Sequence, residues 1–414
     1  MATVPSTKSM ILDLPPSCVE FWPLNPQYAV IGTYNLQKEE ANAEPGEGPE
    51  ADELSEVAEE KKSQHRNGSL ILVEVNGDEV NIIQTLATPS AILDLHFCPS
   101  HSLPSHFGVA TSTGSLVLYK LTSSNSSPII SKLSSNSSKP QIAHVKTLQW
   151  FPSDLLVTAF SWHPTEPIAA MTLTDGSVML GHTEHPLHAK QVAQHDLEAW
   201  TLAIRPEDSN VSILSGGDDS ALISTSLPSP LAFSDNEEDI AALSPLSTWK
   251  NKKIHQAGVT AILPLSNLVQ DQNLILTGSY DDHIRLLSAP FLGRPTVLAE
   301  ANLGGGVWRL KLLNPAPATA PVSLDGEGYG VIAVVLASCM HAGARIVKLI
   351  REKGEGGDAW GFEVVACFEE HRSMNYGSDV QPVGNGKEVG RSGEESRTFL
   401  TTSFYDRLCC LWRF

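Results

Sequence analysis

A short pattern of strands recurs along the chain and limits the possible folds more than any other feature of the sequence. Each copy has an apolar strand ending near Pro, a second apolar strand with small residues, a turn of Gly, Ser or Asp, and a third strand with alternating apolar side chains. VTAFSWHP with IAAMTLTDGSVMLGH is one copy, and GVTAILPL with LILTGSYDDHIRLLSAP is another. Such alternation is typical of strands that bury one face. The pattern therefore predicts an all-β fold of repeated units.

Seven copies can be placed, and their spacing predicts the architecture. The shortest distances between successive starts are 44 and 47 residues, close to the ~40–45 residues of a WD-repeat blade. Two separate β domains would leave the recurring turn chemistry unexplained. We predict one domain over 1–414, a seven-bladed WD-repeat β-propeller, in which 1–16 adds the outer strand of the last blade. The predicted blades are 17–76, 91–121, 154–183, 198–227, 257–290, 304–349 and 378–414.

The longer spacings hold insertions with the composition of loops. We predict disordered loops at 39–66, 122–139, 228–247 and 383–396, the first of which begins with an acidic run, because highly charged segments of low hydropathy cannot form a core. The chain has 28 basic and 47 acidic residues, a net charge of −19. This balance argues against direct nucleic-acid binding, which needs a basic face.

Targeting, membrane and metal signals are weak. The longest apolar run, 331–340, is too short to span a membrane, and 1–16 lacks the features of a secretory signal. The six cysteines have no CxxC spacing, so neither a disulfide framework nor a zinc motif is expected. His182, His185 and His188 match no HExxH site. We expect a cytoplasmic protein with no membrane partner, no metal and no cofactor.

Three copies carry a histidine before the first strand and an aspartate in a later turn. The pairs are His195 with Asp218, His255 with Asp281, and His371 with Asp406. Each pair resembles a catalytic dyad, but an active site occurs once whereas a structural device recurs. We interpret the pairs as buried hydrogen-bonding groups of the blades.

One copy breaks this rule, and a broken repeat is where a functional site is expected. Aligning SYDDHIR with CMHAGAR places His341 at the position of Asp281, and the same copy opens with a glycine run that includes Gly305 and Gly306. His341 is a candidate acid or base near neutral pH. A degenerate blade with a structural histidine is the alternative.

Equivalent positions of the blades converge on the propeller axis, so the starts of the first strands should surround one mouth of the central channel. The residues expected there include Glu198, Trp200, Trp308, Tyr376 and Asp379. Asp94 and His96 share one face of a first strand and are expected to point into the channel. Such a ring of carboxylates, aromatics and a histidine favours a polar pocket, with a channel of ordered water as the alternative.

Longer strings are more specific than the blade pattern. The strings LGGGVWR, CMHAG and EHRSMNYGSD occur in that order, together with CVEFWP, AILDLHF, HDLEAW and SFYDRLCCLW. On these strings the sequence resembles the diphthine methyl ester hydrolase family, the WD-repeat proteins of diphthamide biosynthesis. The resemblance covers most of the ordered chain. One departure is Leu287-Ser288, where WD repeats tend to have Trp-Asp.

The resemblance implies a reaction on elongation factor 2, which carries a modified histidine. A methyltransferase leaves that side chain with a trimethylammonium group and a methyl-esterified carboxylate. The family removes the ester methyl as methanol, giving diphthine, and a separate ligase then amidates the free carboxylate. Elongation factor 2 is the expected partner, and the amidating ligase is a second one. Alternatives are a non-catalytic scaffold that presents the factor to this ligase, or a ubiquitin-ligase receptor.

Ester hydrolysis needs an activated water or nucleophile and donors for the tetrahedral oxyanion. A quaternary ammonium also needs aromatic faces or carboxylates. We predict His341 as the base, with Ser373 as a candidate nucleophile, although a loop serine more often stabilises a turn. The predicted catalytic residues are His341, Ser373 and Asp379, and the predicted substrate-binding residues are Glu198, Trp200, Gly305, Gly306, Trp308, Arg309 and Tyr376.

Overall fold

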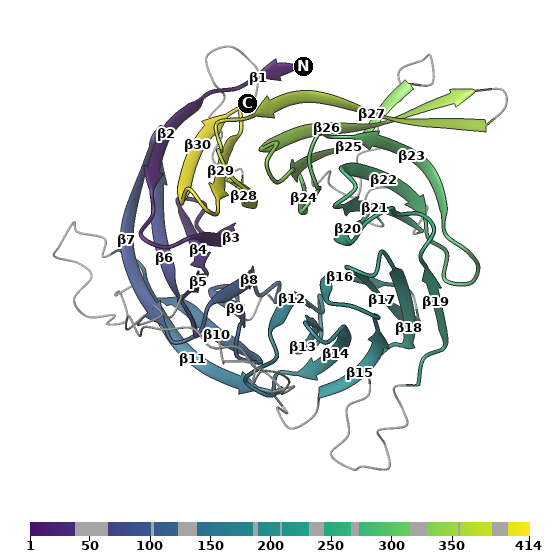
Figure 1. Ribbon diagram of the computed structural model, residues 1–414, viewed down its shortest axis with the longest axis horizontal. Coiled ribbons are helices and arrows are strands. Elements are labelled where there is room, and N and C mark those ends of the chain that lie inside the picture. The colour runs from purple at the N-terminus through teal and green to yellow at the C-terminus, as the bar shows by residue number, and fades with distance from the viewer. Residues whose placement is uncertain are drawn as a thin grey trace, which may run out of the picture.

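Seven sheets surround a central channel in the computed structural model, and every regular element of the described residues is a strand (Figure 1). This confirms the predicted all-β, seven-bladed propeller. In the described part of the chain, no helix has the length and apolar character that a membrane crossing needs. The structure describes residues 1–37, 65–100, 103–122, 139–184, 189–207, 209–231, 244–265, 273–313, 329–354, 357–382 and 396–414. The loops predicted at 39–66, 122–139, 228–247 and 383–396 lie largely outside these residues.

Each blade is an antiparallel sheet whose strands run from the channel outward in chain order. The first four blades are β3 (Pro16–Phe21), β4 (Tyr28–Thr33), β6 (Arg66–Asn76) and β7 (Glu79–Thr88), with the short β5 (Asn35–Leu36) beside β6; β8 (Ile92–Phe97), β9 (His106–Thr111), β10 (Ser115–Thr122) and β11 (Gln141–Gln149); β12 (Val157–Trp162), β13 (Ile168–Leu173), β14 (Ser177–His182) and β15 (Ala189–Gln194); and β16 (Ala199–Pro206), β17 (Asn210–Gly217), β18 (Leu222–Pro228) and β19 (Ser247–Asn251).

The last three blades follow the same order. They are β20 (Val259–Pro264), β21 (Leu274–Ser279), β22 (His283–Ser288) and β23 (Thr296–Asn302); β24 (Arg309–Leu312), β25 (Tyr329–Ser338), β26 (Ala344–Gly354) and β27 (Gly357–Phe368); and β28 (Asn375–Val380), β29 (Thr398–Ser403) and β30 (Leu408–Arg413), with β2 (Ser6–Ile11) as the outer strand.

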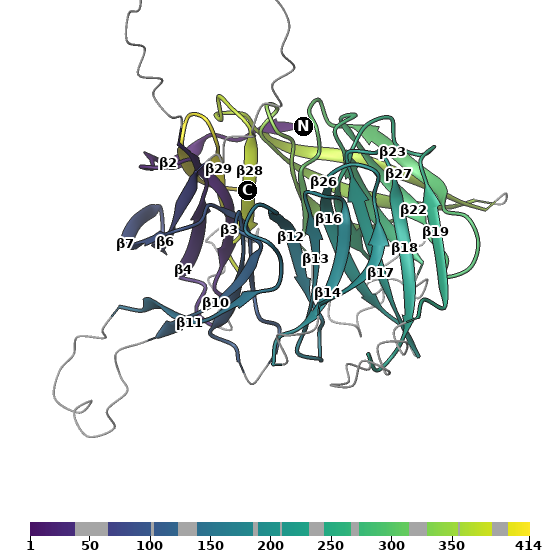
Figure 2. The same ribbon diagram turned by 60° about the horizontal axis from the view of Figure 1, so that its bottom comes forward.

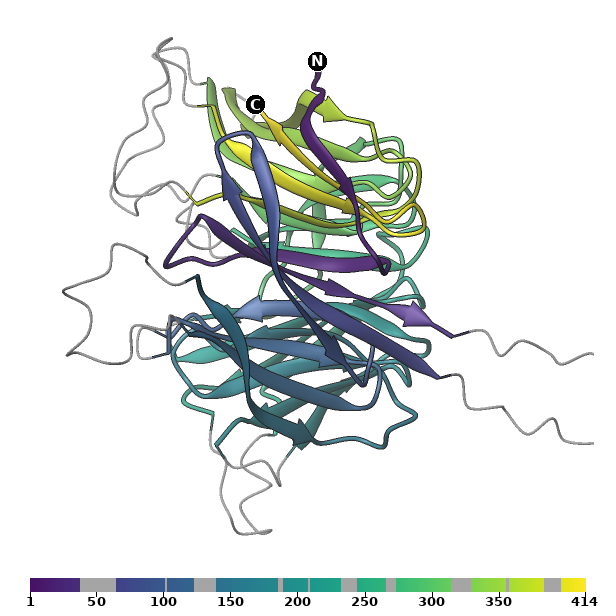
Figure 3. The same cartoon turned by 90° about the vertical axis from the view of Figure 1, so that its left-hand side faces the viewer.

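The N-terminal segment closes the ring. β2 pairs antiparallel with β30, so the two ends of the chain complete one sheet (Figures 1 and 3). The short β1 (Ala2–Thr3) pairs in parallel with β27 of the preceding blade. The expectation that 1–16 supplies the outer strand of the last blade is confirmed, and the same segment also joins that blade to its neighbour.

The hydrophobic core lies between neighbouring blades, which face one another around the channel (Figure 2). Between the first and second blades, Leu70, Ile92 and Phe107 have no exposed surface. Between the last two blades, the Trp412 ring stacks on Phe399 and Phe368, with centroid distances of 4.2 and 5.1 Å. Burial of one such side chain contributes about 1.5–3 kcal/mol, so blade-to-blade contact stabilises each sheet.

The buried histidines make the expected structural hydrogen bonds, but the partners differ from the prediction. His195 Nδ1 lies 2.9 Å from Asp219 Oδ1, and its Nε2 lies 2.9 Å from Ser215 Oγ. The pairing of His195 with Asp218 is therefore wrong by one residue. The two aspartates are adjacent in the turn, and the carboxylate of Asp219 is the one that points back toward the blade.

The other two histidines bond a threonine of the second strand instead of an aspartate. His255 Nε2 lies 2.9 Å from Thr277 Oγ1, and His371 Nε2 lies 2.8 Å from Thr401 Oγ1. The predicted hydrogen bonds to Asp281 and Asp406 are not formed in the described structure. Each aspartate instead accepts the backbone N–H of the residue that follows the histidine. Burial lowers the pKa of both histidines to about 4, so these imidazoles are neutral parts of the fold.

Candidate active site at the central channel

Aromatic side chains from four consecutive blades meet at one end of the channel. The Trp308 ring centroid lies 5.8 Å from that of Trp200, 6.0 Å from Tyr280 and 4.9 Å from Tyr376. Phe404 lies 5.5 Å from Tyr376. Trp200 and Trp308 belong to the fourth and sixth blades, and two such residues can touch only near the axis. All five rings are half-buried, and we call them the aromatic mouth.

A partly buried carboxylate accompanies the aromatic mouth. A Cβ at Gly258 would lie 2.9 Å from Asp218 Oδ1 and 2.9 Å from Tyr280 Cδ2, so this glycine allows the carboxylate to approach the ring. Burial raises the pKa of Asp218, and the charge of Glu198 raises it further. The mouth therefore combines exposed ring faces with negative charge, which is the chemistry that holds a quaternary ammonium.

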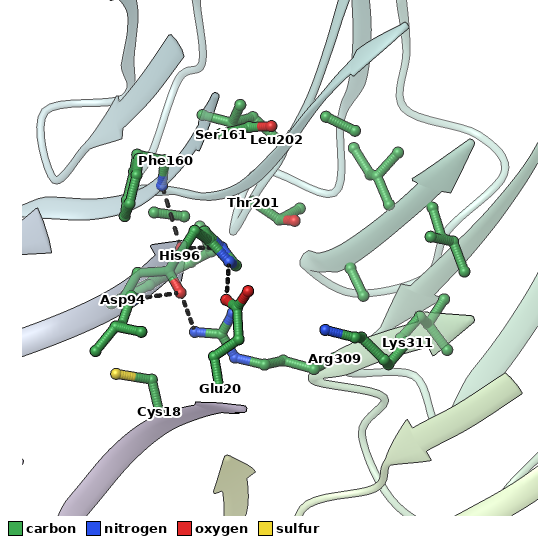
Figure 4. A pocket seen from close by; sticks show the side chains of 18 of the residues that line it. Cys18, Glu20, Asp94, His96, Phe160, Ser161, Thr201, Leu202, Arg309 and Lys311 are labelled. Atoms are coloured by element: carbon green, nitrogen blue, oxygen red, sulfur yellow. Dashed lines mark hydrogen bonds and ion pairs between the residues drawn. The ribbon is translucent and has the colours of Figure 1, made fainter. Parts of the chain in front are cut away.

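A cavity of about 400 Å³ lies in the channel, and Trp200 and Trp308 line it together with the inner strands (Figure 4). Cys18 is the thiol on its wall. Burial raises the pKa of Cys18 to about 12, and the charge of Asp94 adds to this rise. The Cys18 thiol thus stays protonated at neutral pH and is a poor nucleophile.

Three cations and the carboxylates of Glu20 and Asp94 line one side of the cavity, and Asp379 pairs with one of the cations; we call these six groups the charged wall. Four ion pairs join these groups: Glu20 Oε2 to His96 Nδ1 at 2.9 Å, Asp94 Oδ2 to His96 Nε2 at 3.2 Å, Asp94 Oδ1 to Arg309 Nη2 at 2.8 Å, and Asp379 Oδ1 to Lys311 Nζ at 3.0 Å. Figure 4 shows His96 between Asp94 and Glu20, with Arg309 reaching toward the same group.

The two kinds of charge are buried to different depths. The side chains of Asp94, Asp379 and Glu20 are 2%, 3% and 15% exposed. Those of Arg309, His96 and Lys311 are 27%, 37% and 43% exposed. The cationic groups therefore present the more accessible surface, although Glu20 and Asp94 also line the cavity.

The wall fixes the protonation of its histidine. Burial alone would lower the pKa of His96, but Asp94 and Glu20 outweigh it and raise this pKa to about 10. Burial would likewise raise the pKa of Asp94, and Arg309 and His96 hold it well below its usual range. The pKa of Lys311 is raised by Asp379 and Glu20 against the effect of burial. At neutral pH His96 is a cation and a hydrogen-bond donor, so it cannot accept a proton as a base.

The chain is similar in sequence to proteins named diphthine methyltransferase. The diphthine methyltransferase of Schizosaccharomyces pombe is 28% identical over 247 residues, 59% of this chain and 59% of that protein. That of Saccharomyces cerevisiae is 28% identical over 250 residues, 56% and 54%, and that of Homo sapiens is 26% identical over 383 residues, 89% and 72%. The chain is a homologue of these proteins. This confirms the resemblance found in the sequence.

The match to the yeast relatives covers part of each protein. The chain spans between 54 and 59% of the length of the two yeast relatives that it matches. No family model matches the sequence. A chain in the crystal structure of a mitotic checkpoint complex superposes with a TM-score of 0.57 at 12% identity, covering 100% of this chain and 93% of that chain. A likeness at that identity shows the propeller fold alone.

The structure brings several predicted residues of this homologue together. Trp200, Trp308 and Tyr376 meet in the aromatic mouth, and Glu198 lies near Asp218. Gly305 and Gly306 have a packing reason, because a Cβ would lie 2.3 Å from the Cys339 carbonyl oxygen at the first and 2.8 Å from Met340 Sδ at the second. Their proposed role toward an oxyanion stays a prediction.

Asp379 and Arg309 are not where the sequence analysis placed them. Asp379 is buried, pairs with Lys311, and accepts the N–H of Phe21 at 2.7 Å. Arg309 reaches along the cavity to Asp94. The position of these two side chains at the mouth is therefore wrong. Residues 309, 311 and 379 lie further along first strands than Trp308 and Tyr376, so their side chains reach the interior of the channel.

Ser373 has a structural role in the described residues. Its Oγ accepts the backbone N–H of Met374 at 2.6 Å and that of Tyr405 at 2.9 Å. No hydrogen bond joins Ser373 to a histidine in the described structure, so the geometry of an activated serine is absent there. Ser373 therefore stabilises a turn in this structure, and its role as a nucleophile stays a prediction.

His341 lies in the turn between β25 and β26 and is exposed. Its neighbour Met340 packs on Gly306 and forms a bridge with Asn375, which comes directly before Tyr376. Within the described residues, no hydrogen bond or ring contact engages the His341 imidazole. His341 thus differs from Asp281 and Asp219 at the equivalent positions, whose carboxylates are occupied by backbone and side-chain contacts.

Tyr280, Asp218 and Phe404 were missed as site residues. All three follow the second strand of a blade, and the register places them at equivalent turn positions. This equivalence could have been used for prediction, because the turns after the second strands surround the same mouth as the starts of the first strands. Glu20 and Lys311 carried no such signal. Among the described residues, no group of three His, Cys, Asp or Glu side chains is arranged to hold a metal ion; His185 and His188 lie outside them.

Proposed function

We propose that this chain hydrolyses the methyl ester of methylated diphthine on elongation factor 2, giving diphthine and methanol. The relatives are named for diphthine and for a methyl group, which supports a role in diphthamide biosynthesis. One observation carries the proposal: half-exposed aromatic rings with a partly buried carboxylate open onto a cavity lined by cationic groups. Elongation factor 2 as partner, the amidating ligase as a second partner, and a cytoplasmic location belong to the same proposal.

The aromatic mouth suits the trimethylammonium group of the substrate. A quaternary cation over an aromatic face gains about 0.5–1 kcal/mol when exposed and about 2 kcal/mol when desolvated. Trp308 touches three other rings, so it presents the centre of this surface. Asp218 and Glu198 supply the countercharge. A trimethylated nitrogen has no N–H to donate and no lone pair to accept, so it is bound by charge and contact and not by hydrogen bonds.

The reaction needs a base and a place for developing negative charge. A base removes a proton from water, the water oxygen bonds to the ester carbonyl carbon, and the carbon–methoxy bond then breaks. The methoxy oxygen leaves with a proton as methanol, and the product keeps a carboxylate. We assign the base to His341, because its imidazole is exposed, its neighbour Met340 packs on Gly306 and pairs with Asn375, and it makes none of the structural contacts that occupy the blade histidines.

The deciding experiment incubates esterified elongation factor 2 with the purified chain and no other protein. Ester hydrolysis removes one methylene from the modified histidine, a loss of about 14 Da by formula, with methanol as the second product. Both signals together support the proposal. Binding of the factor with neither signal would support a scaffold that presents the factor to the amidating ligase. Loss of the methyl group without methanol would indicate transfer to another acceptor.

A further inference from the structure

We infer that the charged wall is a carboxylate-binding site, in which Arg309 and Lys311 receive the acid end of a ligand whose trimethylammonium end lies in the aromatic mouth, with the His96 cation adding positive charge nearby. The ligand class is a betaine, a molecule that carries a quaternary ammonium and a carboxylate. This inference rests on the proposed function for the identity of the natural ligand. The carboxylate site itself stands on the geometry of the wall.

The carboxylates of the wall are held from behind. Asp94 accepts the backbone N–H groups of Leu95 at 3.1 Å and of Phe160 at 3.2 Å. Asp379 accepts those of Phe21 at 2.7 Å and Val380 at 2.9 Å. These bonds fix the carboxylates in place, and the cations that they bind are oriented before a ligand arrives. An orientation set in advance lowers the cost of binding.

Donor capacity remains on the side that faces the cavity. Lys311 has three N–H donors and one ion pair within the described residues, to Asp379. Arg309 has five N–H donors and lines the cavity, and its ion pair with Asp94 uses Nη2. A carboxylate oxygen in the cavity can therefore bind the part of the guanidinium that remains exposed.

The wall is neutral as a sum but polarised in space. Its cationic groups are more exposed than its carboxylates, so most of the charge that a ligand in the cavity can reach is positive. Trp200, Trp308, Arg309 and Lys311 all line this one cavity. One small ligand therefore meets ring faces at the mouth and cations inside. Reversing it would put its carboxylate against Asp218 and its ammonium against Lys311, so the charges also fix the orientation.

The same polarity would favour hydrolysis over mere binding. The ester is uncharged, whereas the tetrahedral intermediate and the product carry negative charge on oxygen. Donors that interact more strongly with these states than with the ester lower the barrier. We therefore place Arg309 and Lys311 beside the reacting carbonyl, and the positive charge of His96, whose two ring nitrogens are bound to Glu20 and Asp94, adds to the field there.

The test measures binding of three small probes at pH 7 by isothermal titration or ligand-observed NMR. Trimethylglycine carries both groups, acetate carries only the carboxylate, and tetramethylammonium carries only the cation. The variant Lys311→Met removes one cation of the wall. Lys139→Met is the matched control, since Lys139 is exposed and forms a 3.0 Å ion pair with Glu74 of β6, away from the cavity. A lost charge-assisted hydrogen bond corresponds to a weakening of about tenfold or more.

We expect Lys311→Met to weaken trimethylglycine and acetate about tenfold while tetramethylammonium and the control remain unchanged. Equal affinity of trimethylglycine in the wild type and in Lys311→Met would overturn the inference. If Lys311→Met does not fold, the double variant Lys311→Met with Asp379→Asn removes both charges of the pair, and the same two outcomes apply to it. Thermal unfolding of each variant checks the fold.

The inference and the proposed function can fail separately. Acetate binding that depends on Lys311, with no tetramethylammonium binding, would keep the carboxylate site and remove the cation site on which the proposed function rests. Tetramethylammonium binding that depends on Trp308, with acetate indifferent to Lys311, would keep that cation site and overturn the carboxylate site.

Discussion

The aromatic mouth and the charged wall border the same cavity but are held together in different ways. Trp308 and Arg309 are neighbours in sequence, yet one belongs to each region. The rings of the mouth touch through their faces and edges at 4.9–6.0 Å, whereas the wall is a network of ion pairs anchored to backbone amides. The mouth can lose one ring and stay folded. The wall cannot lose one charge without leaving its partner buried and unpaired.

The wall also joins parts of the chain that are far apart in sequence. Glu20 and Asp94 lie on the first two blades, Arg309 and Lys311 on the sixth, and Asp379 on the last. Its ion pairs therefore cross the closure of the ring, where β2 completes the last sheet. The comparison teaches that changes in the wall should affect stability and binding together, whereas changes in the mouth should affect the ligand alone.

The largest effect is expected in the wall. Asp94→Ala leaves His96 and Arg309 without their shared carboxylate, and breaking a buried pair in this way costs about 3–5 kcal/mol of unfolding free energy. Chemical denaturation at neutral pH measures the loss. Asp78→Ala is the control, because Asp78 pairs with Arg413 at 3.2 Å on the surface and should cost at most about 1 kcal/mol. Equal losses in the two variants would contradict the distinction between wall and surface.

A similar effect on activity, but none on stability, is expected at the edge of the mouth. His341→Ala should lower ester hydrolysis about 10²–10⁴-fold, the usual contribution of a general base, and leave the unfolding midpoint unchanged because the side chain is exposed. Release of methanol measures the activity. His144→Ala on the outer strand β11 serves as a second exposed histidine. Near-normal turnover of His341→Ala would remove His341 as the base and leave Asp218, whose pKa is raised by burial.

A smaller effect is expected at the centre of the mouth. Trp308→Ala removes the ring that contacts three others, and the loss of one cation–π contact of about 1–2 kcal/mol would lower affinity for tetramethylammonium about 5- to 30-fold. Trp360→Ala is the control, since Trp360 lies on the outer strand β27 with Arg351 over its ring. A variant Trp308→Ala that unfolds while Asp94→Ala remains stable would reverse the assignment of the two regions.

The sequence could predict the mouth better than the wall, for physical reasons. The repeat fixes which residues begin each first strand, so Trp200, Trp308 and Tyr376 could be placed together without knowledge of side-chain directions. The wall depends on how Arg309 and Lys311 reach carboxylates on other blades. The repeat pattern describes single blades, so it does not predict the distances between side chains of different blades. The same limit explains the error between Asp218 and Asp219, two adjacent carboxylates that differ only in the direction in which a turn points them.

The smallest predicted effect is a difference in the pH dependence of stability between the wall and the blades. His371 has a folded pKa of about 4, below the unfolded value of about 6.5. Its contribution is therefore present above pH ~6.5 and falls as the pH drops, by about 1–2 kcal/mol at pH 5. His96 has a folded pKa of about 10, so its contribution is complete below pH ~6.5 and is lost as the pH rises toward 10.

Urea unfolding of the wild type, His371→Gln and His96→Gln at pH 5, 7 and 9 separates these two effects. The stability gap between the wild type and His371→Gln should be narrower at pH 5 than at pH 7. The gap between the wild type and His96→Gln should be narrower at pH 9 than at pH 7, because only the protonated imidazole holds Asp94 and Glu20 together. If both gaps narrowed on the acid side, His96 would be a neutral blade histidine, and the cationic face of the wall would consist of Arg309 and Lys311 alone.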